Sequence, residues 1–239
     1  MKKSQGFISK ITDLSSSLFL CYTFPNKMQN TKTILHEIPS VWNAESLVLI
    51  LGTMPSPKSR EAGFFYMHPQ NRFWRVLPAV FGEQFVYAND GTRKDESAHM
   101  AGDRNASGRN ADTARTAPNR EAAIAERKDF LLCHHIALWD VLASCDIHGA
   151  ADASIRNAVP NDFHELFERS QIRRVFCTGK TAFNLWERFC ATEYEVRYNL
   201  TSECLPSTSP ANAAWSVERL IEAYKVISET VNTDYGFIR

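Results

Sequence analysis

Ser46-Leu47-Val48-Leu49-Ile50-Leu51, followed by Gly52, is the stretch that decides the fold. A short apolar run that stops at a turn residue predicts a strand buried on both faces, because a half-exposed strand would alternate apolar and polar residues. A second strand is predicted over Arg173-Arg174-Val175-Phe176-Cys177 and stops near Gly179. Weaker strand patterns cover residues 135–138 and 198–205.

Helical patterns separate these strands. They cover residues 72–81, 120–133, 161–169 and 181–189, and apolar residues recur at helical spacing from 217 to 227. Strands that alternate with helices predict an α/β protein, here a three-layer α/β/α sandwich around a central, mostly parallel four-stranded sheet. Ligands bind to such sheets beyond the carboxyl ends of the strands. Two segments rich in Pro, Ser and Thr, residues 52–57 and 205–212, follow strands and are expected to meet there.

The chain is expected to form a single domain over residues 41–239, preceded by a partly disordered extension over residues 1–40. Residues 1–27 show no sustained period, so either Met28 is the true start or this segment is loosely held. Between Tyr87 and Ile124 there is no Ile, Leu, Val, Phe, Tyr or Trp. Such a stretch cannot bury enough apolar surface to offset its chain entropy, which predicts a disordered insertion at about 88–120.

Composition excludes several classes of protein. The formal net charge is zero, so any nucleic-acid contact must come from a local basic patch. The six cysteines form no CxxC pair, which favours free thiols and no metal or iron–sulfur site. No apolar run reaches the ~18 residues of a membrane helix. We therefore expect a cytoplasmic monomer with no cofactor, no metal and no membrane contact.

One turn looks like part of a phosphate-binding loop. Thr178-Gly179-Lys180-Thr181 resembles the end of such a loop, but Arg174 stands where the loop needs glycine. We interpret the turn as a strand-to-helix connection in which Thr181 caps the helix.

The segment from Phe64 to Trp74 is unusual. It reads Phe64-Phe65-Tyr66-Met67-His68-Pro69-Gln70-Asn71-Arg72-Phe73-Trp74 and combines five aromatic residues with His, Gln, Asn and Arg. A flat heterocycle needs rings to stack on and polar groups to read its edge. The alternative is a helix entry whose rings pack inward, which explains Phe73 and Trp74 but not the amides.

Four segments of the chain form an ordered set of motifs. They are Leu49-Ile50-Leu51-Gly52-Thr53-Met54-Pro55-Ser56, Phe65-Tyr66-Met67-His68-Pro69-Gln70-Asn71-Arg72-Phe73-Trp74, Leu138-Trp139-Asp140-Val141-Leu142 and Leu205-Pro206-Ser207-Thr208-Ser209-Pro210-Ala211-Asn212. Together they resemble the signature of hypoxanthine-DNA glycosylases, a branch of the uracil-DNA glycosylase superfamily. The resemblance covers roughly residues 45–228 without the insertion, and any one segment alone would be weak.

This resemblance implies removal of hypoxanthine from DNA and assigns the catalytic role to Asn71. Many superfamily members carry Asp or Asn in the first motif, which reads Thr53-Met54-Pro55 here, between Gly52 and Ser56. Members with strong uracil activity begin the later motif with His, where this chain has Leu205. In this branch the Asn of the His-Pro-x-Asn segment supplies the missing carboxamide, which holds water near the anomeric carbon. The implied reaction is attack by water alone, without strand cleavage.

The remaining site residues follow from the same resemblance. Phe65 or Tyr66 is expected to stack on a base flipped out of the duplex, and the cost of flipping is lower for hypoxanthine because it pairs poorly with thymine. Trp139 and Asp140 are expected to read the base edge, or else to be a core Trp and a capping Asp. The expected DNA-binding residues are Ser207, Thr208, Ser209, Ala211 and Asn212. Ser56, Ser207 and Ser209 would clamp phosphates or serve plain turn chemistry, and Ala211 and Asn212 would lie on a loop that enters the duplex gap.

The sequence thus favours a monofunctional glycosylase acting on deaminated bases in DNA, chiefly deoxyinosine, in base-excision repair. A noncatalytic nucleic-acid-binding module of the same fold and a uracil-directed glycosylase stay open as alternatives. A hydrolase of free nucleosides is less favoured, because such enzymes usually need an acidic metal cluster that this sequence lacks.

Overall fold

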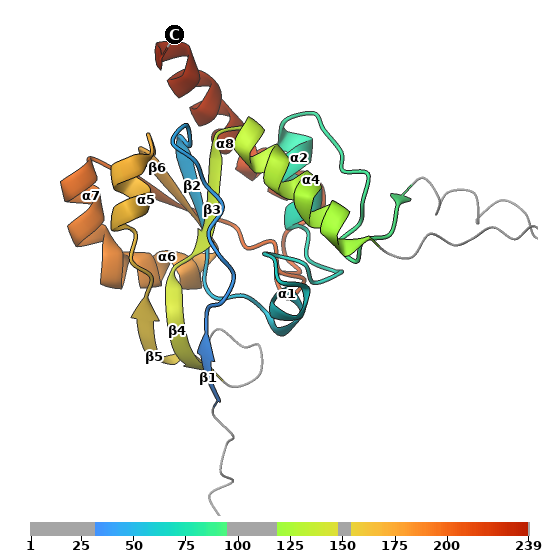
Figure 1. Cartoon of the computed structure of the whole chain (residues 1–239), viewed down its shortest axis with the longest axis horizontal. Helices are drawn as coiled ribbons and strands as arrows, with labels where there is room; N and C mark the ends of the chain where they lie inside the picture. Colours follow the sequence, from blue (N-terminus) through green and yellow to red (C-terminus); the bar gives the residue numbers. More distant parts are fainter. Residues whose placement is uncertain (1–31, 95–118, 148–153, 239) are drawn as a thin grey trace, which may run out of the picture. The chain divides into compact units, whose positions relative to one another are not determined.

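The computed structural model describes residues 32–94, 119–147 and 154–238, which all belong to one unit, Thr31–Arg239 (Figure 1). The predictions for residues 1–27, and for most of the insertion, lie outside the described residues. Residues 88–94, which the prediction placed in the insertion, are described and hydrogen-bonded: the Ala88 amide donates to the Thr92 carbonyl over 2.8 Å, and the Asn119 amide to the Gly91 carbonyl over 3.0 Å.

The centre of the fold is the predicted parallel sheet. Its strands are β2 (Val48–Gly52), β3 (Ile136–Asp140), β6 (Arg174–Thr178) and β7 (Thr201–Leu205). They run in the order β3-β2-β6-β7, and every neighbouring pair is parallel. Strand β2 is buried along its whole length, as its unbroken apolar run requires. The predicted fold class, a three-layer α/β/α sandwich, is confirmed.

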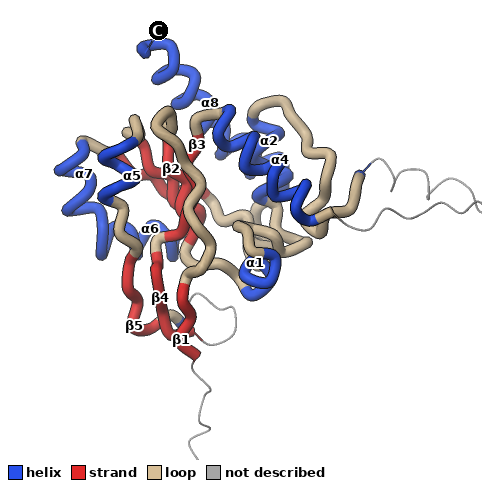
Figure 2. The backbone as a smooth tube through the Cα atoms, viewed as in Figure 1, coloured by secondary structure: helices blue, strands red, loops and turns tan. Residues whose placement is uncertain are grey.

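Two hydrophobic cores form on the two faces of this sheet. Side chains alternate between the faces of a strand, so Val48 and Ile50 enter one core while Leu49 and Leu51 enter the other. The first core is covered by α2 (Phe73–Val80), α4 (Arg120–Cys133) and α8 (Val217–Ile238). The second is covered by α5 (His164–Arg169), α6 (Lys180–Trp186), a π-helical turn η2 (Glu187–Ala191) and α7 (Thr192–Tyr198) (Figure 2).

A second sheet was not predicted. It is antiparallel, has the order β1-β4-β5, and consists of β1 (Lys32–Leu35), β4 (Leu142–Ile147) and β5 (Arg156–Pro160). Strand β4 follows β3 after a single residue, so the chain passes directly from one sheet into the other. Because β1 pairs with β4, the end of the predicted N-terminal extension is part of this fold.

Two local predictions were wrong. Tyr198 does not open the last strand but ends α7; Asn199, with a left-handed φ of 52°, then turns the chain toward β7 at Thr201. Thr181 does not cap α6, because the helix already begins at Lys180 after Gly179. A further short helix, α1 (Pro57–Ala62), follows the first motif and is capped by the Ser56 hydroxyl.

No helix among the described residues combines the length and the apolar character needed to span a lipid bilayer.

The core supplies a stability test. Leu138 in β3 is fully buried in the first core, whereas Val196 on α7 is 82% exposed. Leu138→Ala should lower the free energy of unfolding by about 2–5 kcal/mol, because it leaves a cavity that the sheet cannot close. Val196→Ala should change it by less than about 0.5 kcal/mol. Urea denaturation of both variants checks this, and equal effects would contradict the assigned burial.

Candidate functional site

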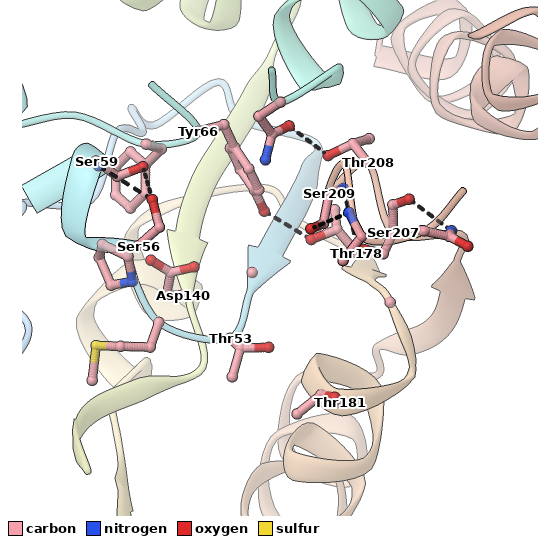
Figure 3. Close-up of a pocket in the computed structure, with 18 of the residues that line it drawn as sticks. Thr53, Ser56, Ser59, Tyr66, Asp140, Thr178, Thr181, Ser207, Thr208 and Ser209 are labelled. Carbon is pink, nitrogen blue, oxygen red and sulfur yellow. Dashed lines mark hydrogen bonds between the residues drawn. The ribbon is translucent and has the colours of Figure 1, made fainter. Parts of the chain in front are cut away.

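A cavity of about 530 Å³ lies beyond the carboxyl ends of the parallel strands (Figure 3). This volume lies in the usual range of small-molecule and cofactor sites. The segments 52–57 and 205–212 meet there as expected, together with the ends of β3 and β6. Its lining residues are Gly52, Thr53, Met54, Pro55, Ser56, Pro57, Ser59, Arg60, Phe65, Tyr66, Asn71, Asp140, Ile147, Thr178, Gly179, Lys180, Thr181, Ser207, Thr208, Ser209, Ala211 and Asn212.

Trp139 is the one predicted site residue that does not line the cavity. Its ring packs edge-on against Phe163, with the centroids 5.1 Å apart, and it contacts both cores. Successive residues of a strand face opposite sides of the sheet, so Trp139 turns away while Asp140 faces the cavity. The geometry supports the alternative interpretation of Trp139 as a core residue.

The carboxamide of Asn71 is held in one orientation. Its Oδ1 accepts a hydrogen bond from the backbone N–H of Phe73 and another from the Thr208 hydroxyl, both over 2.9 Å. A backbone N–H can only donate, so the atom facing it must be the oxygen. Both acceptor positions of Oδ1 are therefore filled, and Nδ2 has no partner among the described residues. Because Asn71 lines the cavity, its free capacity there is that of a hydrogen-bond donor.

Thr208, one of the predicted DNA-binding residues, lines the cavity but is only 1% exposed, and its hydroxyl is directed at Asn71. The geometry thus makes Thr208 a positioning residue for the carboxamide.

Arg72 ties the loop after β7 to the segment that carries Asn71. Its guanidinium donates to the carbonyl oxygens of Thr208, Ser209, Asn212 and Trp215. The contacts to Ser209 and Asn212 are 2.6 and 3.0 Å long. A planar fork with several fixed donors can satisfy converging carbonyls, which a single ammonium group cannot. Sequence analysis noted Arg72 within the aromatic segment but gave it no role.

The serines of this loop are engaged in turn chemistry. The Ser207 hydroxyl accepts from the amide of Ser209 over 3.2 Å, and the Ser209 hydroxyl accepts from the amide of Ala211 over 3.3 Å. The side-chain amide of Asn212 donates to the Ser207 carbonyl over 2.9 Å. All four residues still line the cavity, so the loop presents a pre-shaped surface.

Of the two candidate stacking residues, Tyr66 is the more accessible. Phe65 is 1% exposed and packs against Phe64. Tyr66 is half-buried, lines the cavity and stacks one ring face on Phe73 at a centroid distance of 4.0 Å. Tyr66 has a φ of 56°, a strained conformation for a bulky residue.

The Tyr66 hydroxyl is also fixed. It lies 2.8 Å from the Thr178 hydroxyl, which itself donates to the Leu51 carbonyl over 3.2 Å (Figure 3). Thr178 has only one proton, so Tyr66 is the donor of this pair and keeps only acceptor capacity. Burial raises the pKa of Tyr66 well above its usual value, which keeps the phenol neutral.

Asp140 forms the floor of the cavity beside Gly52. A Cβ atom at position 52 would lie 2.1 Å from Asp140 Oδ1 and 2.7 Å from the Tyr66 hydroxyl oxygen, so only glycine permits this approach. Asp140 Oδ2 lies 3.0 Å from His36 Nε2. Burial raises the pKa of the Asp140 carboxyl, and the hydrogen bond and charge of His36 oppose that rise.

Several lining residues were missed by sequence analysis. Two cationic residues, Lys180 and Arg60, line the cavity, and Ile147 brings the second sheet to it. Lys180 directly follows the turn after β6, so the strand-end rule alone would have placed it here. His36 carries no such signal, because it pairs with Asp140 across 104 residues of sequence. Among the described residues, no three His, Cys, Asp or Glu side chains gather as metal ligands would.

Comparison with known proteins adds a family to this geometry. The family described as Uracil DNA glycosylase superfamily matches residues 39–228, which include every lining residue of the cavity. A protein of Methanosarcina acetivorans named Hypoxanthine DNA glycosylase is 25% identical over 182 residues, covering 76% of this chain and 90% of the relative. A protein of Methanosarcina barkeri with the same name is 26% identical over 165 residues, covering 69% and 83%.

A solved structure shows the same fold. It is a solution NMR structure of a protein from Methanosarcina acetivorans, named as a candidate uracil DNA glycosylase. The TM-score is 0.57 at 23% identity, and the match covers 83% of this chain and 99% of the other.

The Arg72 contacts generate a test of loop rigidity. Arg72→Lys should lower the free energy of unfolding by about 1–3 kcal/mol, because four partly buried carbonyl groups lose donors that hold the loop. Hydrogen exchange should accelerate in residues 207–215 more than in the cores. Arg169→Lys, which alters an exposed pair with Glu165, is the control and should change neither quantity. Unchanged exchange in 207–215 would show that the loop does not depend on Arg72.

Gly52 generates a second test. Gly52→Ala should cost about 1–3 kcal/mol of stability, because the new methyl group overlaps Asp140 Oδ1 and the Tyr66 hydroxyl. In an Asp140→Ala background the same substitution should cost less, since one of the two clashes is gone. A thermal or urea double-mutant cycle measures this difference. Strictly additive effects would mean that the two residues do not meet.

Proposed function

This chain belongs to the uracil DNA glycosylase superfamily, and from that premise we propose that it is a monofunctional DNA glycosylase acting on deaminated bases, chiefly hypoxanthine. The names of two relatives at 25% and 26% identity support the choice of base. The observation that carries the proposal is the fixed carboxamide of Asn71 on the wall of the cavity. The first motif offers Thr53-Met54-Pro55, with neither a carboxylate nor a carboxamide, so Asn71 fills the role that this motif lacks.

The cavity suits a single flipped nucleotide. An enzyme that acts on the glycosidic bond must take the nucleotide out of the stack and hold its base in a pocket. In this proposal the base lies against the ring face of Tyr66 that does not stack on Phe73, with its edge toward Asp140. Phe65, which is buried, supports the pocket from behind rather than stacking on the base.

The reaction breaks the bond between C1′ of the sugar and N9 of hypoxanthine. The electron pair of that bond leaves with the base, which then takes a proton from solvent. The oxygen of a water molecule bonds to the cationic C1′ and releases a proton to solvent. An electrophile of this kind needs a positioned nucleophile more than a strong base. The Nδ2 donors of Asn71 hold that water by one of its lone pairs, and the other lone pair attacks.

DNA contacts in this proposal come from two parts of the cavity rim. Lys180 and Arg60 supply the local positive charge that the neutral chain as a whole lacks, and they contact phosphates. Ala211 and Asn212 lie on the loop that Arg72 clamps, so this loop enters the gap left by the flipped nucleotide as a rigid element. The hydroxyls of Ser207 and Ser209 shape this loop in addition to any phosphate contact.

The central test is hydrolysis of an oligonucleotide that contains one deoxyinosine opposite thymine. Alkali after incubation should cleave the strand at the abasic site, and no cleavage should occur without alkali. Asn71→Ala should lower the single-turnover rate on the order of 10²–10³-fold, as loss of one preorganised donor does. Asn71→Asp should lose about as much, because its carboxylate still accepts from Phe73 and Thr208 but offers no N–H to the cavity. Thr208→Val should lose activity and Thr208→Ser should keep it.

Asn184→Ala, which removes an exposed carboxamide on α6, is the matched control and should leave the rate unchanged. Asn71→Asp at the wild-type rate would mean that Asn71 acts as an acceptor. Binding of the oligonucleotide without product would instead support the noncatalytic module, and product from deoxyuridine alone would support a uracil-directed enzyme. Because Lys180 lines the cavity, borohydride trapping is included; a covalent adduct would contradict attack by water alone.

A further inference from the structure

His36 has no part in the function proposed above, although its partner Asp140 faces the edge of the base there. His36 lies in the connection from β1 to β2, outside the residues that the family matches and outside the lining of the cavity. Its imidazole reaches the cavity only through Asp140. The side chains of His36 and Asp140 are 1% and 5% exposed, so solvent does not compete for their contact.

The imidazole is held firmly in place. Its ring lies between Phe65 and Trp139, with centroid distances of 5.9 and 6.4 Å. The backbone amide of His36 donates to the Ala143 carbonyl over 2.8 Å, which anchors the connection to the second sheet. This caging fixes Nε2 at 3.0 Å from Asp140 Oδ2.

Only one oxygen of Asp140 is tied in this way. The other, Oδ1, lies over Gly52 on the cavity floor and has no partner among the described residues. We propose that His36 is a positioning residue that keeps Asp140 Oδ1 a hydrogen-bond acceptor, so that the cavity selects bases with a ring N–H over bases with a ring lone pair. This inference rests on the proposed function and extends it to the choice of base.

Wherever the proton between His36 Nε2 and Asp140 Oδ2 lies, Oδ1 stays an acceptor. When Asp140 is ionised, His36 Nε2–H donates to Oδ2, and Oδ1 accepts. When the shared proton sits on Asp140, the contact with Nε2 holds that proton on Oδ2, and Oδ1 is a carbonyl oxygen that again accepts. Without His36, nothing assigns the proton to Oδ2. The buried carboxyl would then take up a proton more readily and present an O–H to the cavity.

The groups around Asp140 also favour hydrogen-bond acceptors at the floor of the cavity. Tyr66, from the segment before α2, is the other titratable group beside it, and its hydroxyl proton is already given to Thr178. Arg60 of α1 and Lys180 of α6 are the cationic residues that line the cavity, and Arg60 Nη1 donates to the Pro55 carbonyl over 2.7 Å. The floor of the cavity therefore offers acceptors from both Asp140 and Tyr66.

Bases differ in whether they can donate a hydrogen bond to an acceptor at this position. Hypoxanthine carries an N–H at N1, from which Asp140 Oδ1 can accept a hydrogen bond. Adenine carries a lone pair at N1, which would face the lone pairs of Oδ1 in the same position. A site built to accept from an N–H rejects an analogue that lacks it, because the buried acceptor is left unpaired. Uracil and xanthine also carry a ring N–H beside a carbonyl, so the pair defines a class of bases.

The experiment compares His36 variants on two oligonucleotides, one with deoxyinosine and one with deoxynebularine, whose purine base has a lone pair at N1. Single-turnover rates are measured from pH 5.5 to 8.5. In His36→Leu the ratio of hypoxanthine to purine excision should fall at least tenfold at pH 6. The acidic limb of the rate profile for deoxyinosine should move to higher pH in His36→Leu, because the pKa of Asp140 rises further without His36 and its protonated carboxyl can then present an O–H to the cavity. The loss should be smallest at pH 8.5.

His36→Gln is the conservative variant, because its side-chain amide can donate to Oδ2. It should keep the wild-type ratio at pH 8.5, and its acidic limb should lie between those of the wild type and His36→Leu, because Gln lacks the charge of His36. His36→Phe fits the space between Phe65 and Trp139 and serves if His36→Leu does not fold. A purely structural role would lower both rates in parallel at every pH, and that result would overturn the inference while leaving the function intact. A wild-type enzyme that excises neither base would instead contradict the proposed function itself.

Discussion

The hydrogen bonds of Asn71 and Arg72 to the loop after β7 are the constraint on which the site depends. Four partly buried carbonyl groups of residues 208–215 converge on one guanidinium, and leaving them without donors would lower stability. This convergence fixes the path of the loop, and the path brings the Thr208 hydroxyl to Asn71 Oδ1. Two neighbouring residues therefore act together: Arg72 shapes the loop, and the loop in turn orients the side chain beside Arg72. The carboxamide and the loop are thereby joined in one hydrogen-bond network at the cavity.

Each polar group that faces the cavity is fixed either as a hydrogen-bond donor or as a hydrogen-bond acceptor. Asn71 offers donors because both acceptor positions of its oxygen are filled, while Tyr66 offers an acceptor because its proton is committed to Thr178. Asp140 adds a second acceptor on the same floor. Groups that are oriented before the substrate arrives need no reorganisation during the reaction, which is where such sites gain most of their effect. In the proposed function the donors of Asn71 hold the attacking water, and the acceptors of Asp140 and Tyr66 recognise the base.

Particular residues show how far sequence patterns reach. The strand β2 and the helix α4 were predictable because an unbroken apolar run and a long period of helix formers each leave one interpretation. The meeting of segments 52–57 and 205–212 followed from the rule that parallel strands end at one edge. The second sheet was missed because β5 is largely exposed and β4 mixes Ser, Cys and Asp with apolar residues. The contact of His36 with Asp140 and the contact of Thr208 with Asn71 join distant positions, so no local period or spacing records them.

The sparse first motif has a physical reason in this arrangement. Position 52 can hold only glycine, since a methyl group there would overlap both Asp140 Oδ1 and the Tyr66 hydroxyl. The space beside the end of β2 is thus occupied by side chains that come from β3 and from the segment before α2. A carboxylate in that motif would bring a second negative group toward the buried Asp140, whose pKa burial already raises. In the proposed function the carboxamide comes instead from Asn71, which another segment brings to the same cavity. The departure of Thr53-Met54-Pro55 from the usual pattern and the presence of Asn71 are then two parts of a single arrangement.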